Sequence, residues 1–206
     1  MLNIINSVNT AERCQRNWDH SKPVLKEHIQ QIVEVATTMP TKNNRGYYDL
    51  VVSTNPEFNR TCYKYAVDPR NLHFKDREIH RNTQVDAPLL LLWRTTDLDN
   101  IDNPYDDSYQ KDFHISVGIS SGAAVLTANH LGYRTGYCQC FDSDKLFNVL
   151  EQKFSLPIVN TRYKDILAVG IGHPDSNFKR TQCVIDGKLG YTAESVNKTI
   201  DITYIN

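Results

Sequence analysis

The sequence DFHISVGISSGAAVLTANHLGYRTGYCQCFD, from Asp112 to Asp142, decides how the rest of the chain is organised. From Ile115 to Leu131 apolar residues recur every three or four positions and fill most of the remaining circumference, which predicts a buried helix. Residues with little side chain, such as Gly118, let another helix or a flat ligand approach closely. Gly132 is placed to end the helix as a C′ glycine, and the cysteine-containing loop Tyr137–Phe141 follows.

The composition indicates one soluble domain that covers residues 1–206. Because 23 Lys and Arg are balanced by 24 Asp and Glu, nothing favours a general nucleic-acid or anionic-membrane binder. The longest apolar run, Ala87–Trp93, is too short to cross a bilayer, and the first residues lack the apolar core of a secretion signal. We therefore expect a cytoplasmic protein whose five cysteines are reduced and lack metal-site spacing.

Hydrophobic periodicity places the other elements around this helix. A short helix Ala11–Arg16, capped by Ser7 or Asn9, is expected near the start. The run Leu89–Trp93 fits a central strand covered on both faces, and the tail Ile200–Tyr204 alternates like a strand without a neighbour in sequence. Further helices are expected at 24–39, 56–66 and 144–154, further strands at 47–54 and 165–172, and a loop at 97–109, while 72–81 is ambiguous. This irregular mixture favours an α+β fold over a doubly wound sheet.

Several common catalytic motifs are missing from the sequence. It contains no P-loop, no Gly-x-Ser-x-Gly elbow and no His-Glu-x-x-His. The segment Gly170-Ile171-Gly172 lacks the third glycine of a dinucleotide fingerprint and is soon followed by Pro174. Three loops rich in basic, amide or small residues remain, at 13–18, 40–44 and 137–141.

Five segments, taken in chain order, resemble the nitroreductase family of FMN-dependent proteins. Glu12-Arg13-Cys14-Gln15-Arg16-Asn17-Trp18 is similar to the family's Arg-Arg-Ser-x-Arg-x-aromatic segment, and Met39–Asn44 to its Pro-Ser-x-x-Asn loop. The other three segments lie at 85–88, 117–133 and 167–172, so the resemblance covers nearly the whole chain. It implies a mixed central sheet flanked by helices, with the C-terminal strand exchanged in a homodimer.

The resemblance also implies which residues hold the FMN phosphate. Arg13 and a basic residue near the C-terminus, either Lys179 or Arg180, would make charge-assisted contacts to it. Cys14 stands where the family has a phosphate-contacting serine, and a thiol is the weaker donor. Arg16 corresponds to the basic residue near flavin N1 and O2, where a cation stabilises the charge of the reduced ring.

Contacts to the flavin ring are implied in three further segments. Asn82, or alternatively Gln84, would hydrogen-bond the pyrimidine edge of the ring. Gln139 and Cys140 correspond to positions whose backbone amides face flavin N5 and O4. A loop that in the family reaches the flavin bound mainly by the other subunit corresponds here to Pro40, Thr41, Lys42 and Asn44.

The implied activity is that of an FMN oxidoreductase in which NAD(P)H delivers hydride, leaves, and is replaced by a nitroaromatic, quinone or enone acceptor. The cofactor carries this chemistry, so no catalytic side chain is implied. Two alternatives stay open: a specialised member that fragments flavin or dehalogenates its substrate, and a flavin-binding dimer without turnover. Glu12, where many members have arginine, and Cys14 keep the second alternative open.

We expect Cys14→Ser to retain or tighten FMN binding, because a hydroxyl is a better hydrogen-bond donor than a thiol. A fluorescence titration that gives the FMN dissociation constant of both proteins checks this. A marked loss of flavin would mean that Cys14 does not correspond to the family's serine.

Overall fold

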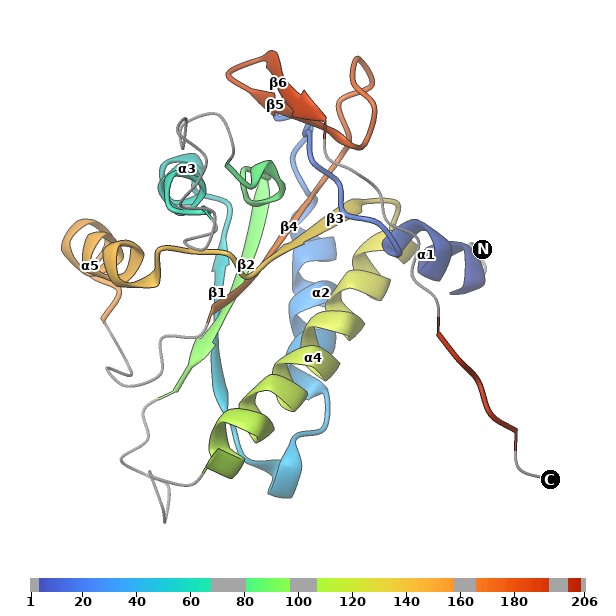
Figure 1. Ribbon diagram of the computed structural model, residues 1–206, viewed down its shortest axis with the longest axis vertical. Coiled ribbons are helices and arrows are strands. Elements are labelled where there is room, and N and C mark those ends of the chain that lie inside the picture. The colour runs from blue at the N-terminus through green and yellow to red at the C-terminus, as the bar shows by residue number, and fades with distance from the viewer. Residues whose placement is uncertain (1–3, 68–80, 97–106, 158–165, 193–199, 205–206) are drawn as a thin grey trace.

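The computed structural model describes residues 4–67, 81–96, 107–157, 166–192 and 200–204, and its centre is a sheet flanked by helices (Figure 1). The strands run in the order β1-β2-β4-β3, and every neighbouring pair is antiparallel. The predicted α+β architecture is therefore confirmed, while the sheet, expected to be mixed, is antiparallel throughout its described strands. The bounds of the four strands are β1 Tyr48–Ser53, β2 Leu89–Thr95, β3 Arg134–Cys138 and β4 Ile166–Gly172.

Helices cover both faces of this sheet. On one face lie α2 (Lys26–Thr38) and α4 (Asp107–His130), with α1 (Ile4–Ala11) packed against α4. On the other face lie α3 (Pro56–Lys64) and α5 (Ser143–Phe154), as Figure 1 shows. The bounds of α2, α3 and α5 lie within two residues of those predicted. Among the described residues, no helix is both long and apolar enough to cross a membrane.

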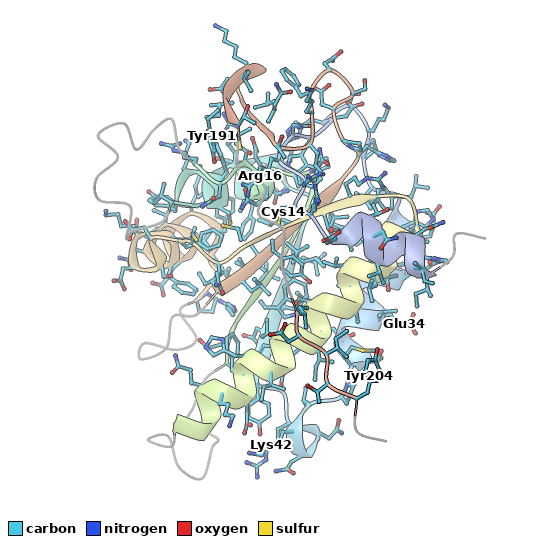
Figure 2. The ribbon with its side chains drawn as sticks, turned by 45° about the vertical axis from the view of Figure 1, so that its right-hand side comes forward. Cys14, Arg16, Glu34, Lys42, Tyr191 and Tyr204 are labelled. Atoms are coloured by element: carbon cyan, nitrogen blue, oxygen red, sulfur yellow. The ribbon has the colours of Figure 1, made fainter. Side chains whose placement is uncertain are left out.

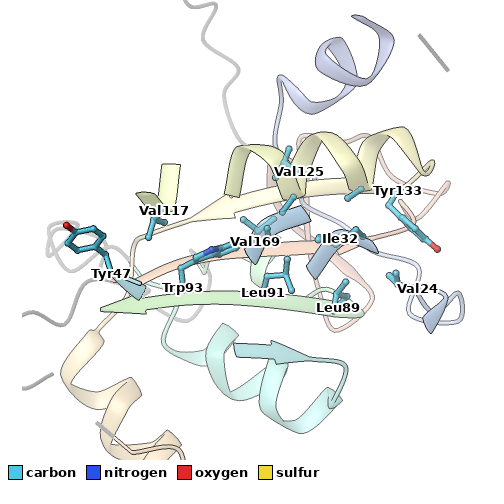
Figure 3. Close-up of a cluster of buried hydrophobic side chains, with 14 of the residues drawn as sticks. Val24, Ile32, Tyr47, Leu89, Leu91, Trp93, Val117, Val125, Tyr133 and Val169 are labelled. Atoms are coloured by element: carbon cyan, nitrogen blue, oxygen red, sulfur yellow. The ribbon is translucent and has the colours of Figure 1, made fainter. Parts of the chain in front are cut away.

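Strand β2 divides the core into two halves, and all of its residues are buried. Leu89, Leu91 and Trp93 pack toward α2 and α4 (Figure 3). Leu90 and Leu92 pack toward α3 and α5. This division follows from the two-residue period of a strand, which points successive side chains to opposite faces. The prediction of a central strand covered on both faces is confirmed.

The central helix α4 is longer than predicted and is buried on only part of its circumference. It begins at Asp107, so residues 107–109 are helical rather than part of the predicted loop. Ile115 and Ile119 are 52% and 42% exposed in the single chain, which contradicts the predicted all-round burial. At its end Gly132 has a φ of +95°, a conformation that only glycine adopts readily, as expected of a C′ glycine.

One buried hydroxyl ties α4 to the elements around it. Ser120 Oγ accepts a hydrogen bond from Trp93 Nε1 at 2.9 Å and donates one to the Ala36 carbonyl at 2.7 Å. The helix, the central strand and α2 are thus joined at a fully buried point.

The predicted helix Ala11–Arg16 is wrong, because the chain leaves α1 there and becomes extended. Ser7 and Asn9, the predicted caps, lie inside α1. The extended residues gain pairing with the sheet instead, since the Gln15 amide donates to the Thr135 carbonyl in β3 at 2.8 Å. A tertiary contact has here outweighed the local helical pattern.

The predicted loop Tyr137–Phe141 is partly a strand, because its first two residues complete β3. This strand lies at the edge of the described sheet and pairs with β4. Its central residue, Gly136, is a turn signal in sequence, which conceals the strand.

The structure also contains a hairpin that was not predicted from the sequence. Its strands are β5 (Gln182–Ile185) and β6 (Lys188–Thr192). Asp186 and Gly187 join them with φ values of +49° and +75°, the left-handed conformations of a type I′ turn. The Asp-Gly dipeptide is the sequence signal for this turn.

The tail Ile200–Tyr204 forms no strand pairing within the described part of the chain. Its apolar side chains are exposed, Ile200 at 69%, Ile202 at 70% and Tyr204 at 82%. Exchange of this segment with a second subunit therefore stays a prediction.

Two glycines bring a turn directly onto the sheet. Gly136 and Gly170 face each other across β3 and β4. A Cβ at Gly170 would lie 2.0 Å from the Gln84 carbonyl oxygen, and one at Gly136 would lie 2.6 Å from Gln84 Cβ. Only residues without a side chain admit the 3-10 turn η2 (Thr83–Val85) at this distance. The Gly170-Ile-Gly172 sequence thus serves packing rather than dinucleotide binding.

We expect Gly170→Ala to destabilise the fold by at least about 3 kcal/mol, the upper end of typical overpacking, because backbone opposes the new methyl group. Urea denaturation gives the free energy of unfolding. The control is Gly46→Ala, at a glycine with φ outside the left-handed region and nothing within 4 Å of an added Cβ. Equal stability of the two variants would contradict the close approach.

Candidate functional site

The extended segment Cys14–Trp18 is fixed to the η2 turn by Thr83. The Thr83 hydroxyl donates to the Arg16 carbonyl at 2.7 Å, and the Thr83 carbonyl accepts from Trp18 Nε1 at 3.0 Å. Thr83 and Trp18 are both buried. The backbone that carries Cys14 and Arg16 is therefore held at Arg16 itself and, through the Trp18 side chain, two residues further along the chain.

The Arg16 guanidinium is held by a buried amide. Arg16 Nη1 donates to Gln84 Oε1 at 2.9 Å, and Gln84 Nε2 donates to the Tyr137 carbonyl at 3.1 Å. Gln84 is only 5% exposed. Both ends of its amide are used, so its orientation is fixed. Because the partner of Arg16 is neutral, its positive charge is oriented without being neutralised.

Two further arginines lie near Arg16. Arg180 Nη1 donates to the Cys14 carbonyl at 3.1 Å, which brings the C-terminal part of the chain to this segment. Burial lowers the pKa of Arg180, and the positive charges of Arg13 and Arg16 lower it further, against the opposing effects of Cys14 and Glu12. Like charges that converge in this way favour binding of an anion. Lys179 has an exposed side chain, and its carbonyl accepts from Asn17 Nδ2 at 2.7 Å, so Arg180 is the basic residue brought into this cluster.

The cysteine-containing segment after β3 borders the same region. The Cys14 thiol donates to the Tyr137 carbonyl at 3.9 Å, and the Cys138 thiol donates to the Cys140 carbonyl at 3.7 Å. The neighbouring Cys140 side chain, together with burial, holds the pKa of Cys138 well above its ordinary value, so this thiol stays protonated. Gln139 has an exposed side chain. Within the described residues, no three His, Cys, Asp or Glu side chains are grouped as metal ligands.

Asn82 and Gln84, the two alternatives for the pyrimidine edge, adjoin each other, since Gln84 Nε2 lies 3.5 Å from Asn82 Oδ1, but their other contacts differ. Asn82 Nδ2 donates to the Ala66 carbonyl at 3.1 Å, so this amide nitrogen is directed toward the end of α3. Gln84 is placed beside Arg16 instead. Of the two side chains, only that of Gln84 contacts the arginine cluster directly.

The loop that contains Pro40, Thr41, Lys42 and Asn44 is not part of this cluster. Figure 2 shows Lys42 at the opposite end of α4 from Arg16 and Cys14. Lys42 Nζ forms an ion pair with Asp112 Oδ2 at 2.8 Å, and residues 42–44 form the 3-10 turn η1. Within one chain the predicted site residues therefore form two separate groups.

Near the arginines, the buried side chain of Asn17 and the half-buried one of Tyr191 were not predicted as site residues. Asn17 Nδ2 donates to the carbonyls of Lys179 and Gln182, at 2.7 and 3.0 Å, and so anchors the segment that carries Arg180. Asn17 lies inside the Glu12–Trp18 motif, and this position could have identified it as a site residue. Tyr191, in β6, donates to the Arg81 carbonyl at 3.0 Å, and burial raises its pKa while the charge of Arg16 opposes this. No pattern in the sequence placed Tyr191 here, because its hairpin was not predicted.

Comparison with known families gives one match over most of the chain. The model of the nitroreductase family matches residues 11–173, which include the arginine segment, the η2 turn and all four strands of the sheet. No protein with curated annotation matches the sequence.

Several solved structures share the fold at low sequence identity. A nitroreductase family protein from Clostridium novyi NT has a TM-score of 0.64 and 12% identity, with 85% of this chain and 87% of that chain covered. A protein from Exiguobacterium sibiricum 255-15, solved in complex with FMN, has a TM-score of 0.64 and 19% identity, with 87% and 91% covered. The gut-bacterial enone reductase CLA-ER has a TM-score of 0.62 and 17% identity, with 84% and 90% covered.

Proposed function

The chain belongs to the nitroreductase family, and on this basis we propose that it is an FMN-dependent oxidoreductase. When bound, FMN supplies the hydride chemistry, taking hydride from NAD(P)H and passing it to a nitroaromatic, quinone or enone in a separate half-reaction. A structural relative solved with FMN and another named as an enone reductase support this assignment.

The observation that carries the proposal is the convergence of Arg13, Arg16 and Arg180. These charges repel one another, and Arg180 has a lowered pKa as a result of burial and of its two neighbours. A phosphate dianion would neutralise the repulsion through charge-assisted hydrogen bonds. We assign the phosphate of FMN to Arg13 and Arg180, with the Cys14 thiol, once it turns from the Tyr137 carbonyl, as a weaker donor beside them.

Arg16 has a different role in this proposal. It is held by the neutral Gln84 amide, so its charge is kept for a ligand and its position is set by the sheet. We assign this charge to the pyrimidine side of the ring, where it stabilises the anionic reduced form. The backbone amides of Gln139 and Cys140 would complete the contacts along the other edge.

The proposed site is shared between two copies of the chain. Lys42 lies at the far end of α4 from Arg16 and is held there by Asp112, so its loop cannot reach the Arg16 cluster of its own chain (Figure 2). The exposed apolar side of α4, with Ile115 and Ile119, fits contact with a second copy. A twofold arrangement would bring the Lys42 loop of each copy to the other's arginines.

We expect Arg16→Ala to raise the FMN dissociation constant about tenfold or more, since a charged hydrogen bond contributes about 1.5–3 kcal/mol. The midpoint potential of bound flavin should become more negative, because the charge opposite the reduced ring is lost. Flavin titration and spectroelectrochemistry measure the two quantities. The control is Arg134→Ala, which removes a partly buried arginine of β3 whose guanidinium donates to the Tyr133 carbonyl. Unchanged affinity and potential in Arg16→Ala would refute its assignment.

Deleting residues from Lys198 onward is expected to weaken the dimer and reduce bound FMN together, because the exposed apolar tail would no longer join the partner subunit. Sedimentation velocity and flavin absorbance on the same sample test this. Deletion of residues 205–206 alone, which keeps Ile200, Ile202 and Tyr204, is the control. A truncated protein that stays a fully flavinated dimer would show that the tail packs elsewhere, and a full-length monomer that binds FMN would defeat the shared site.

A further inference from the structure

A pocket of about 910 Å³ lies between the beginning of α2, the first turns of α3 and the turn that leads into β2. None of the residues assigned above to the flavin is among the described residues that line it. We propose that this pocket is a second ligand site, for a small organic anion with an apolar body and one N–H or O–H donor. Its volume lies within the roughly 300–1,000 Å³ of small-molecule sites.

The apolar part of the pocket belongs to the rigid frame of the protein. Val24 and Ala87 line it and are 7% and 2% exposed, and Ile29 and Pro88 line it beside them. Val24 is a member of the core cluster that also contains Leu89 of β2. The apolar wall is therefore preformed, which suits a ligand with a compact apolar body.

The polar part of the wall contains an unused hydrogen-bond acceptor. Asn59 in α3 is 2% exposed, and its Nδ2 donates to the Ala87 carbonyl at 2.9 Å. A second carbonyl, that of Ser53, lies 3.4 Å from the same nitrogen, so exchanging the amide oxygen and nitrogen would place oxygen against oxygen. Asn59 Oδ1 has no hydrogen-bond partner. Asn59 is among the lining residues, so a small shift of its side chain would let a ligand donor in the pocket reach and satisfy this buried oxygen.

The charged residue next to Asn59 is already neutralised. Arg60 pairs with Asp86 through Nη1 at 2.5 Å and with Asp186 of the β5–β6 turn through Nη2. Arg60 and Asp86 line the pocket as a neutral pair, while Asp186, whose side chain is 74% exposed, is not among the described residues that line it. The residues that select the charge of the ligand therefore lie on another wall of the pocket.

The free positive charge of the pocket is on its α2 side. Lys26 and His20 both line the pocket and are exposed, and among the described residues neither forms an ion pair. With Asp86 paired to Arg60, Lys26 supplies an uncompensated positive charge. An anionic group at the mouth of the pocket is thus favoured over a cationic or neutral one.

The proposal is tested with 8-anilinonaphthalene-1-sulfonate, which combines an apolar body, a sulfonate and one N–H donor. Full-length protein incubated with excess FMN is titrated with this probe, and probe fluorescence gives affinity and stoichiometry. We expect one site per chain. Thr54→Trp, at an exposed lining position, should fill the pocket and abolish the site. Lys26→Glu should raise the dissociation constant about fivefold.

Two controls separate this site from other apolar surfaces. Lys188→Glu makes the same charge change at an exposed position that does not line the pocket and should leave probe binding unchanged. The N-methylated probe lacks the donor and should bind about fivefold more weakly to the wild-type protein. Far-UV circular dichroism verifies that the variants fold. If Thr54→Trp does not fold, the affinity of Lys26→Glu tests the proposal on its own. Any of three results would overturn the proposal. They are a probe that does not bind, a probe that binds the pocket variants as tightly as the wild type, and displacement of the probe by FMN.

Discussion

The arginine cluster depends on the fact that Gly136 and Gly170 have no side chain. They face each other on neighbouring strands and leave a depression into which the backbone of Gln84 fits. Gln84 in turn holds Arg16, and its other amide end is bound to the Tyr137 carbonyl. The position of a surface charge is thus set by backbone packing on a buried sheet. A site built in this way is held more precisely than one carried by a loop alone.

The length of the central helix α4 explains why one chain cannot form the proposed shared site alone. Its 24 residues span about 36 Å at 1.5 Å per residue. Lys42 is anchored near the beginning of this helix by Asp112, whereas Arg16 lies toward its other end (Figure 2). Ser120, bonded to Trp93 and to the Ala36 carbonyl, holds the helix against the sheet. The two groups of basic residues are therefore kept apart by a rigid spacer.

Helices and strands that are determined by neighbouring residues in sequence could be predicted. Those that depend on contacts between distant residues could not. The pattern of β2 and the cap that Asn55 provides for α3 are local, and both elements were placed correctly. Strand β3 was missed because Gly136 weakens its pattern, and the segment after α1 became extended because Gln15 pairs with Thr135. In the proposed site, the resemblance to the family motif predicted Arg13 and Arg16. The motif could not show that Gln84 holds Arg16, because only folding brings the two residues together.

The contacts of the arginine cluster also bear on how the protein acquires its function during folding. Hydrogen bonds there join residues that are 68, 123 and 166 positions apart in sequence. Contacts of such long range carry the full entropy cost of loop closure and form slowly. A ribosome must have released Arg180 before this cluster can exist. The proposed phosphate site therefore cannot form on a chain that has not yet been synthesised past Arg180.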